Sequence, residues 1–263
     1  MPRRDVVAPA VKVFITGASS GLGAALAAHY AARGAVLGLV ARRADRLAAI
    51  AAALAASVSV YAVDVADRDG LAAAAADFIS RHGTPDVVIA NAGISTGTHG
   101  GDPADLAVLE RVLQINVTGL AATLAPFVAP MRTRGSGTLV GIASVAGFRG
   151  LPGSGAYSAS KAAAIAWLEA LRVELHGSGV RVVTACPGYI ETPMTAVNRF
   201  PMPFLMPAAD AASRIARAIE RADALAVLPW QMRLVFVFLR RMPAWLYDRL
   251  FARAPRKPHG PTA

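Results

Sequence analysis

A tyrosine and a lysine lie four residues apart in the stretch "AYSASKAAA", residues 156–164. Side chains at positions i and i+4 of an α-helix project from one face, so Tyr157 and Lys161 would lie one turn apart. Such a pair often marks only a solvated helix surface. Alternatively, the ammonium lowers the pKa of the phenol from about 10 toward neutral pH, which would make Tyr157 a proton donor or acceptor.

A glycine cluster, "TGASSGLG" at residues 16–23, follows an apolar strand-like run and opens a helical run. Its three glycines, Gly17, Gly21 and Gly23, would let the backbone approach a phosphate, and the helix N-terminus would present free N–H groups to it. Glycines also serve ordinary turns. The position between the first strand and the first helix nevertheless favours a dinucleotide site.

The end of the second apolar run, "LVARRADRL", bears on which dinucleotide is bound. An NAD site usually has an acidic residue there to bind the ribose hydroxyls, and this chain has Arg42 and Arg43 instead. Asp45 comes later and is expected to cap the next helix. Arginine suits the 2′-phosphate of NADP, although a solvated pair of surface arginines would have the same sequence. The sequence therefore predicts NADP(H) over NAD(H).

These residues are set in an alternation of short apolar runs and longer alanine-rich helical runs. Near-continuous apolar strands between helices indicate a parallel sheet that is covered on both faces. The predicted fold class is therefore α/β, a doubly wound, Rossmann-type, parallel seven-stranded sheet with helices on both faces. The predicted strands are residues 11–17, 35–41, 58–65, 86–93, 137–144, 180–188 and 224–229.

Several motifs occur in an order that resembles the short-chain dehydrogenase/reductase family, in its compact single-domain branch. The resemblance extends from about Val11 to about Pro229. The motifs are "TGASSGLG", "DV" at 64–65, "NAG" at 91–93, Asn116, Ser144, "YSASK" at 157–161 and "PGYIET" at 187–192. The resemblance implies an NAD(P)-dependent enzyme that interconverts a ketone and a secondary alcohol.

The resemblance also implies a catalytic role for each of four residues. Ser144 would bind the carbonyl oxygen of the substrate, and Tyr157 would transfer the proton. Lys161 would lower the pKa of Tyr157 and hold the nicotinamide ribose, while Asn116 would hold a water that links Lys161 to solvent. Two preplaced hydroxyls could stabilise the alkoxide-like oxygen that hydride transfer creates.

By the same resemblance, Asp64 would accept a hydrogen bond from the adenine amine, and Ile190 and Thr192 would contact the nicotinamide carboxamide. The implied cofactor residues are Gly17, Ser19, Ser20, Gly21, Leu22, Gly23, Arg42, Arg43, Asp64, Val65, Asn91, Ala92, Gly93, Tyr157, Lys161, Pro187, Gly188, Ile190 and Thr192. No metal site is expected. The alternatives are an NAD-preferring alcohol dehydrogenase and a non-catalytic dinucleotide-binding protein, although the latter would most easily have lost Tyr157 or Lys161.

Composition sets further bounds. The chain has 263 residues, of which 55% are hydrophobic, so residues 1–229 are expected to form one cofactor-binding and catalytic domain. A single cysteine excludes an internal disulfide and fits a reducing, cytoplasmic compartment. The net charge of +10 lies mostly after residue 229, in a segment without a nucleic-acid motif, so no nucleic-acid partner is expected.

The substrate is expected to be a small lipophilic carbonyl or alcohol compound. The resemblance implies a mobile lid between "PGYIET" and the next helix. Its apolar residues Met202, Phe204, Leu205 and Met206 suit such a substrate, unless the loop simply packs on the core. Tyr189 is a further candidate for the pocket.

A C-terminal extension, residues 230–253, is predicted to be helical, apolar and basic, and to be followed by a flexible tail at 254–263. Its tryptophans, leucines and arginines match a helix that lies in a membrane interface, at the inner face of a membrane. Alternatively, the same residues pack on the protein's own substrate pocket or across a homo-oligomer, which would be a dimer or a tetramer.

Overall fold

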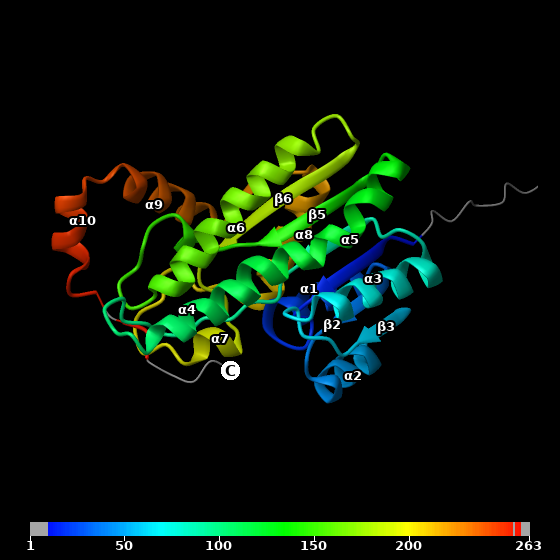
Figure 1. The fold of residues 1–263 in the computed structure, drawn as a ribbon, viewed down its shortest axis with the longest axis horizontal. Helices are drawn as coiled ribbons and strands as arrows, with labels where there is room; N and C mark the ends of the chain where they lie inside the picture. Colours follow the sequence, from blue (N-terminus) through cyan, green and yellow to red (C-terminus); the bar gives the residue numbers. More distant parts are fainter. Residues whose placement is uncertain (1–9, 255, 259–263) are drawn as a thin grey trace, which may run out of the picture.

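The computed structural model describes residues 10–254 and 256–258 and shows a seven-stranded sheet in which all strands are parallel (Figure 1). The strand order is β3-β2-β1-β4-β5-β6-β7, which confirms the predicted doubly wound fold. The strands are β1 (Lys12–Thr16), β2 (Val36–Val40), β3 (Val58–Tyr61), β4 (Val87–Ala90), β5 (Gly137–Ile142), β6 (Val180–Pro187) and β7 (Leu225–Leu228).

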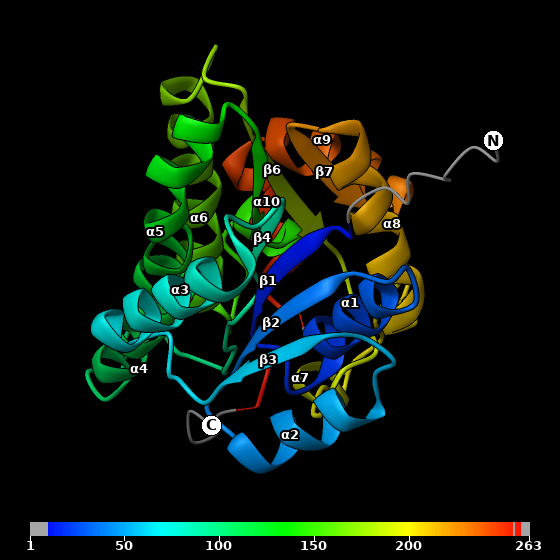
Figure 2. The ribbon, with the colours of Figure 1, turned by 90° about the vertical axis from the view of Figure 1, so that its right-hand side faces the viewer.

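Helices cover both faces of the sheet, and Figure 2 shows α3, α5 and α6 on one side with α1 and α8 on the other. The principal helices of the domain are α1 (Gly21–Ala31), α2 (Ala44–Ala53), α3 (Arg68–His82), α4 (Asp105–Leu113), α5 (Gly119–Arg134), α6 (Gly155–Glu174) and α8 (Ala208–Arg221). The shorter elements and the C-terminal helices are the π-helical η1 (Gln114–Thr118), the 3-10 turn η2 (Val145–Gly147), α7 (Pro193–Ala196), α9 (Trp230–Arg241) and α10 (Ala244–Phe251).

Successive side chains of each strand enter two separate cores. On β1, Val13 and Ile15 pack with α1, α2 and α8, whereas Phe14 packs with Phe78 of α3 and Phe127 of α5. All five of these side chains are essentially inaccessible to solvent. The alternation of faces along a strand therefore explains why the strand sequences are apolar throughout.

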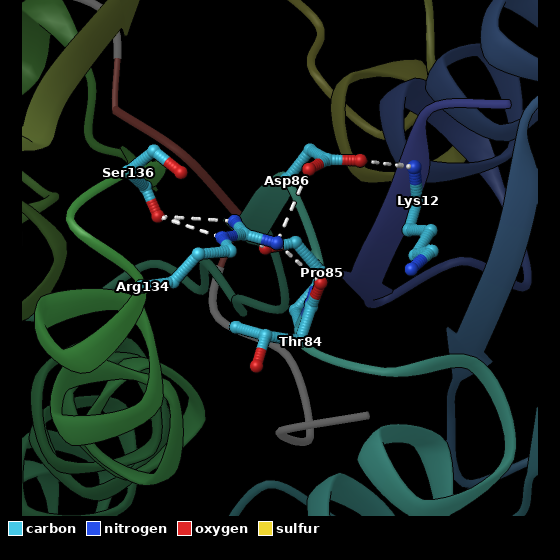
Figure 3. Close-up of polar contacts among 6 residues, drawn as sticks. All are labelled: Lys12, Thr84, Pro85, Asp86, Arg134 and Ser136. Carbon is cyan, nitrogen blue, oxygen red and sulfur yellow. Dashed lines mark hydrogen bonds and ion pairs between the residues drawn. The ribbon is translucent and has the colours of Figure 1, made fainter. Parts of the chain in front are cut away.

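The amino ends of the central strands are tied together by Arg134, the last residue of α5 (Figure 3). Its guanidinium lies 3.3 Å from Asp86, whose carboxylate also accepts a hydrogen bond from the backbone N–H of Lys12 at the start of β1. The Arg134 guanidinium also donates hydrogen bonds to three main-chain carbonyls, those of Thr84, Pro85 and Ser136. This network fixes β1, β4 and β5 at the end opposite to their carboxyl ends.

The helical run from α4 to α5 is not α-helical throughout. A π-helical segment, Gln114–Thr118, lies between α4 and α5 and contains Asn116. The run Asp105–Arg134 is long and apolar enough to cross a membrane by length and composition, but it packs against α3 and β4 as a core helix. Single π-helical turns are frequent at functional sites, and this one determines where Asn116 points.

Candidate active site

The carboxyl ends of the strands surround a cavity of about 250 Å³, at the point where the strand order reverses between β1 and β4. All of the cofactor residues implied by the resemblance line this cavity except Gly23. Of the four expected catalytic residues, Ser144, Tyr157 and Lys161 line it, and Asn116 does not.

The glycine loop fits closely on β4. Gly17 has a φ of +69°, and a Cβ on it would lie 2.8 Å from the backbone of Ala92. A Cβ on Gly23 would overlap the carbonyl oxygen of Gly17, so Gly23 is required for packing of the loop rather than as cavity lining. Ser20, the residue before α1, makes no side-chain capping bond, so its hydroxyl does not satisfy the first-turn N–H groups at the cavity.

Both predicted arginines lie at this end of the cavity. Arg43 donates hydrogen bonds to the hydroxyls of Ser19 and Ser20 at 3.3 Å, and Arg42 lies 3.9 Å from the carboxylate of Asp64. The closer partner of Asp64 is Arg111 of α4, at 3.2 Å. The sequence analysis missed Arg111, because 47 positions separate it from Asp64 and no local pattern connects them. The region around Asp64 is therefore more basic than the sequence indicated.

Ser144 and Tyr157 come from different elements and meet at the inner end of the cavity. Ser144 follows β5 and caps η2, where its Oγ accepts a hydrogen bond from the N–H of Ala146 at 3.2 Å. It also lies 3.4 Å from the carbonyl of Pro187. Tyr157 lies in the first turn of α6, and a hydrogen bond with Ser144 favours its ionised form. The two hydroxyl groups can therefore contact a single substrate oxygen.

The pKa of Tyr157 differs from the sequence-based expectation. Burial raises it above its usual value, and this effect outweighs the hydrogen bond from Ser144, which lowers it. The Lys161 ammonium lies 5.7 Å from the centre of the tyrosine ring. Lys161 itself is 4% exposed and donates to the carbonyl of Ile142 at 2.8 Å. Burial lowers its pKa from 10.5 to about 8, so Lys161 is still mostly charged at neutral pH and loses its charge as pH rises above about 8.

Asn116 connects the loop after β4 to α6. Its side-chain N–H groups donate to the carbonyl of Ile94 and to Ser160 Oγ, both at 2.9 Å, and its oxygen accepts from the N–H of Ile94 at 2.8 Å. The side chain is completely buried. A Cβ on Gly93 would lie 3.2 Å from Asn116 Oδ1 and 3.6 Å from Lys161 Nζ. Asn116 and Lys161 therefore both lie beside Gly93, and the amide groups of Asn116 are occupied by protein partners.

A second cavity, of about 410 Å³, adjoins the first. The residues common to both linings are Ser144, Tyr157, Gly188, Met194 and Thr195. The wall of the second cavity is mostly apolar, and the helices α9 and α10 contribute Met232, Val235, Leu239 and Phe251. The C-terminal extension thus packs on the protein's own pocket, which was one of the two alternatives for it.

The lid residues in the second cavity differ from those expected. Met202, Phe204 and Leu205 do not line it, and Met206 is buried in the core beside Ile190. The residues of this segment that line it are Met194, Thr195, Asn198, Phe200, Pro201 and Pro203, and Tyr189 lines it as anticipated. Periodicity could not identify them, because the segment is irregular and the side-chain directions depend on its individual turns.

The sequence is similar to a known protein family and to known oxidoreductases. The family model described as "short chain dehydrogenase" matches residues 11–201. An uncharacterized oxidoreductase of Myxococcus xanthus is 44% identical over 163 residues, 62% of this chain and 64% of that protein. A cis-4-hydroxycyclohexanecarboxylate dehydrogenase of Sinomonas cyclohexanicum is 36% identical over 63% of this chain and 66% of that protein. These alignments span somewhat less than two thirds of either relative.

Among solved structures, a short chain dehydrogenase from Burkholderia cenocepacia in complex with NADP has a TM-score of 0.80. It is 25% identical, and the match covers 94% of this chain and 98% of that one. The similarity in fold therefore extends over nearly the whole chain.

Proposed function

Because the chain belongs to the short-chain dehydrogenase/reductase family, we propose that it is an oxidoreductase that interconverts a ketone and a secondary alcohol with NADP(H). The observation that carries the proposal is the position of Ser144 and Tyr157, which line both the dinucleotide cavity and the apolar cavity. A substrate oxygen in the second cavity would thus reach both hydroxyl groups beside the cofactor.

The nicotinamide cofactor, when bound, supplies or accepts the hydride. Tyr157 donates a proton to the nascent alkoxide during reduction, and Ser144 donates a hydrogen bond to the same oxygen. The raised pKa of Tyr157 keeps the phenol protonated at neutral pH, which suits reduction. Oxidation requires Tyr157 to accept the proton instead. Lys161, which also lines the cavity, favours the tyrosinate in that direction to the extent that it is charged.

Replacement of Tyr157 by phenylalanine tests this chemistry. We expect turnover of a ketone panel with NADPH to fall by several orders of magnitude, because the variant lacks the transferable proton. The dissociation constant of NADPH, followed by its fluorescence, should change little. A Tyr157→Phe enzyme with near-normal turnover would exclude the assignment, and a wild type that binds NADPH but reduces no ketone would favour the non-catalytic alternative.

Preference for NADP(H) is proposed from Arg42 and Arg43, which lie beside Asp64 and the glycine loop. A charge-assisted hydrogen bond to a phosphate contributes about 1.5–3 kcal/mol. Arg43→Ala and Arg42→Ala should each lower the affinity for NADPH by roughly tenfold or more and leave the affinity for NADH nearly unchanged. Arg46→Ala is the matched control, since Arg46 is exposed on α2 and does not line the cavity. Equal binding of both cofactors by the wild type would instead support the NAD-preferring alternative.

A lipophilic substrate is proposed from the wall of the second cavity, which Phe200, Met232, Leu239 and Phe251 make apolar. The printed name of the Sinomonas relative describes an alicyclic hydroxy acid, which supports a secondary alcohol as one form of the substrate. Activity with ketones of increasing apolar size should therefore rise until the cavity is filled. A preference for the smallest polar ketones would contradict this proposal.

We further propose that the outer face of α9 and α10 contacts the surface of an anionic membrane, from the cytoplasmic side. Trp230, Leu234, Phe238, Trp245 and Leu250 are each more than half exposed on this face. Five exposed arginines are interspersed with them: Arg233, Arg240, Arg241, Arg249 and Arg253. Apolar anchors among basic side chains suit anionic lipid, to which each basic residue adds about 1 kcal/mol of attraction.

Sedimentation with phosphatidylserine vesicles tests the membrane contact. Wild type should bind, and binding should weaken with salt and in a Leu234→Gln, Phe238→Gln, Trp245→Gln variant. Leu106→Gln with Val173→Gln is the control, because both residues are exposed apolar side chains elsewhere, on α4 and α6. The wild type could instead fail to bind vesicles and form a dimer or tetramer that the triple variant dissociates. That result would show that this face is an interface between subunits.

A further inference from the structure

Beyond α10 the chain returns across the substrate cavity, and residues 256–258 are here named the C-terminal strap. Figure 1 shows the chain descending from α10 toward α7 and the start of α4. The N–H of Gly97 donates to the carbonyl of Pro258 at 3.3 Å. A Cβ on Gly153 would lie 2.7 Å from Cβ of Arg256, and one on Gly97 would overlap the backbone of Lys257. Two glycines therefore leave room for the strap. Positions 255 and 259–263 of the predicted flexible tail lie outside the described residues.

The strap places a lysine in the wall of the cavity. Lys257 Nζ lies 2.9 Å from Ser95 Oγ and 3.4 Å from the carbonyl of Met194, and all three residues line the cavity. The lysine is partly buried, and this burial lowers its pKa. Both hydrogen-bond partners are neutral, and no carboxylate of the described residues forms a salt bridge with it. An ammonium held away from water in this way lacks a counter-ion.

The other charged residues in the cavity wall do not supply a counter-ion for Lys257. No aspartate or glutamate occurs among the described residues that line it, and its other charged residue is Arg149. Arg149 donates to the carbonyls of Leu239 and Met242 at the end of α9 and stacks 4.1 Å over the ring of Tyr247. Arg149 is thus occupied in holding the C-terminal helices, and Lys257 is the cation directed toward a ligand.

We propose that the substrate is amphiphilic and carries an anionic group, such as a carboxylate, that pairs with Lys257. This inference rests on the proposed function and specifies its substrate class. The apolar part of the molecule fills the cavity, its carbonyl or hydroxyl oxygen contacts Ser144 and Tyr157, and its anion replaces the neutral partners of Lys257. An ion pair in a partly dehydrated wall is stronger than one in water, so Lys257 would determine specificity without participating in hydride or proton transfer.

Kinetics with matched substrates test the proposal on the full-length enzyme. The probes are apolar keto acids of increasing length, each paired with its methyl ester, with NADPH as reductant. We expect the wild type to prefer the acids, and Lys257→Met to lower kcat/KM for acids by roughly tenfold or more with little effect on esters. Most of the loss should appear in KM. Lys257→Arg should retain the preference, and Arg256→Met is a control that removes a charge from an exposed position of the same strap.

Equal losses for acids and esters in Lys257→Met would show that the lysine only anchors the strap. If Lys257→Met raises the dissociation constant of NADPH and leaves the preference for acids unchanged, the lysine binds a cofactor phosphate instead. Either result overturns the proposal, as does a wild type without preference for acids.

Calorimetry separates this proposal from the proposed function. Octanoate should bind the full-length protein in the presence of NADP⁺ more tightly than 1-octanol does, and Lys257→Met should remove the difference. This binding experiment needs no turnover, so it supports or refutes the anionic ligand even if no ketone is reduced. Equal binding of octanoate and 1-octanol by the wild type would refute it.

Discussion

The lowered pKa of Lys161 predicts a specific dependence of stability on pH. In the folded chain the pKa of Lys161 is about 8, against 10.5 for a lysine exposed to water. Between these values the unfolded chain binds more protons than the folded chain, so the free energy of unfolding rises with pH. Below about pH 8 the folded state carries the full free-energy cost of burying the charged ammonium, and this cost disappears as the pH rises toward 10.5. At about 1.36 kcal/mol per pKa unit, the full effect is about 3 kcal/mol.

The assay is urea unfolding of the cofactor-free protein between pH 7 and about 9.5, compared with Lys161→Met. Other titrating groups are common to both proteins, and the lost hydrogen bond to Ile142 adds an offset that does not depend on pH. The wild type should therefore gain about 2 kcal/mol relative to the variant across this interval. Tyr157→Phe keeps the lysine and should show a pH profile parallel to that of the wild type.

The reasoning would be refuted if the difference in free energy of unfolding between the wild type and Lys161→Met stayed constant within about 0.5 kcal/mol over this pH interval. It would mean that the carbonyl of Ile142 and the surrounding dipoles compensate the lost hydration of the ammonium. A wild type that loses stability relative to Lys161→Met as pH rises would mean that the folded pKa is raised. In that case Lys161 would be fully charged at neutral pH and able to lower the pKa of Tyr157, as the sequence alone suggested.

Three further predictions concern packing. Leu168→Ala removes a completely buried side chain from the core beneath β5 and should cost about 2–5 kcal/mol in urea unfolding. Arg134→Lys cannot reproduce the bonds to three carbonyls and Asp86, so the free energy of unfolding should fall by about 1–3 kcal/mol. The dissociation constant of NADPH should not change. Gly153→Ala should displace the strap at Arg256, which raises KM for the ketone and leaves NADPH binding unchanged; a change in NADPH binding alone would contradict this account.

Local sequence was sufficient for the fold because each strand carries its own signal. Short apolar runs between helical runs predicted all seven strands to within a few residues, and their alternation with helices predicted that the strands are parallel. The glycine motif and the Tyr157–Lys161 pair could be identified from the sequence in the same way, because each depends on neighbours within one turn or loop. The cavity at the carboxyl ends of the strands then brings these separate motifs together.

Features that depend on distant contacts were not accessible in this way. The pairing of Arg111 with Asp64 joins α4 to the loop after β3, and the π-helical segment at Asn116 has no marker in the apolar periodicity. The pKa of Tyr157 is set by how completely the fold removes water from it, so the lysine four residues away could not determine the direction of the shift. Burial is a property of the whole fold, and no spacing rule reports it.

The C-terminal extension shows why its two sequence-based interpretations were both reasonable. A helix that is apolar almost all round needs cover on more than one side. On α9, Met232 and Leu239 face the substrate cavity, whereas Leu234 and Phe238 are exposed on the opposite side. The inner face is therefore accounted for by the pocket, and the outer face still needs a partner. If that partner is a membrane, an amphiphilic substrate could pass from the lipid surface to the cavity on the other side of the same helix. Vesicle binding and acid preference would then depend on different residues of one extension, and the Leu234 and Lys257 variants separate them.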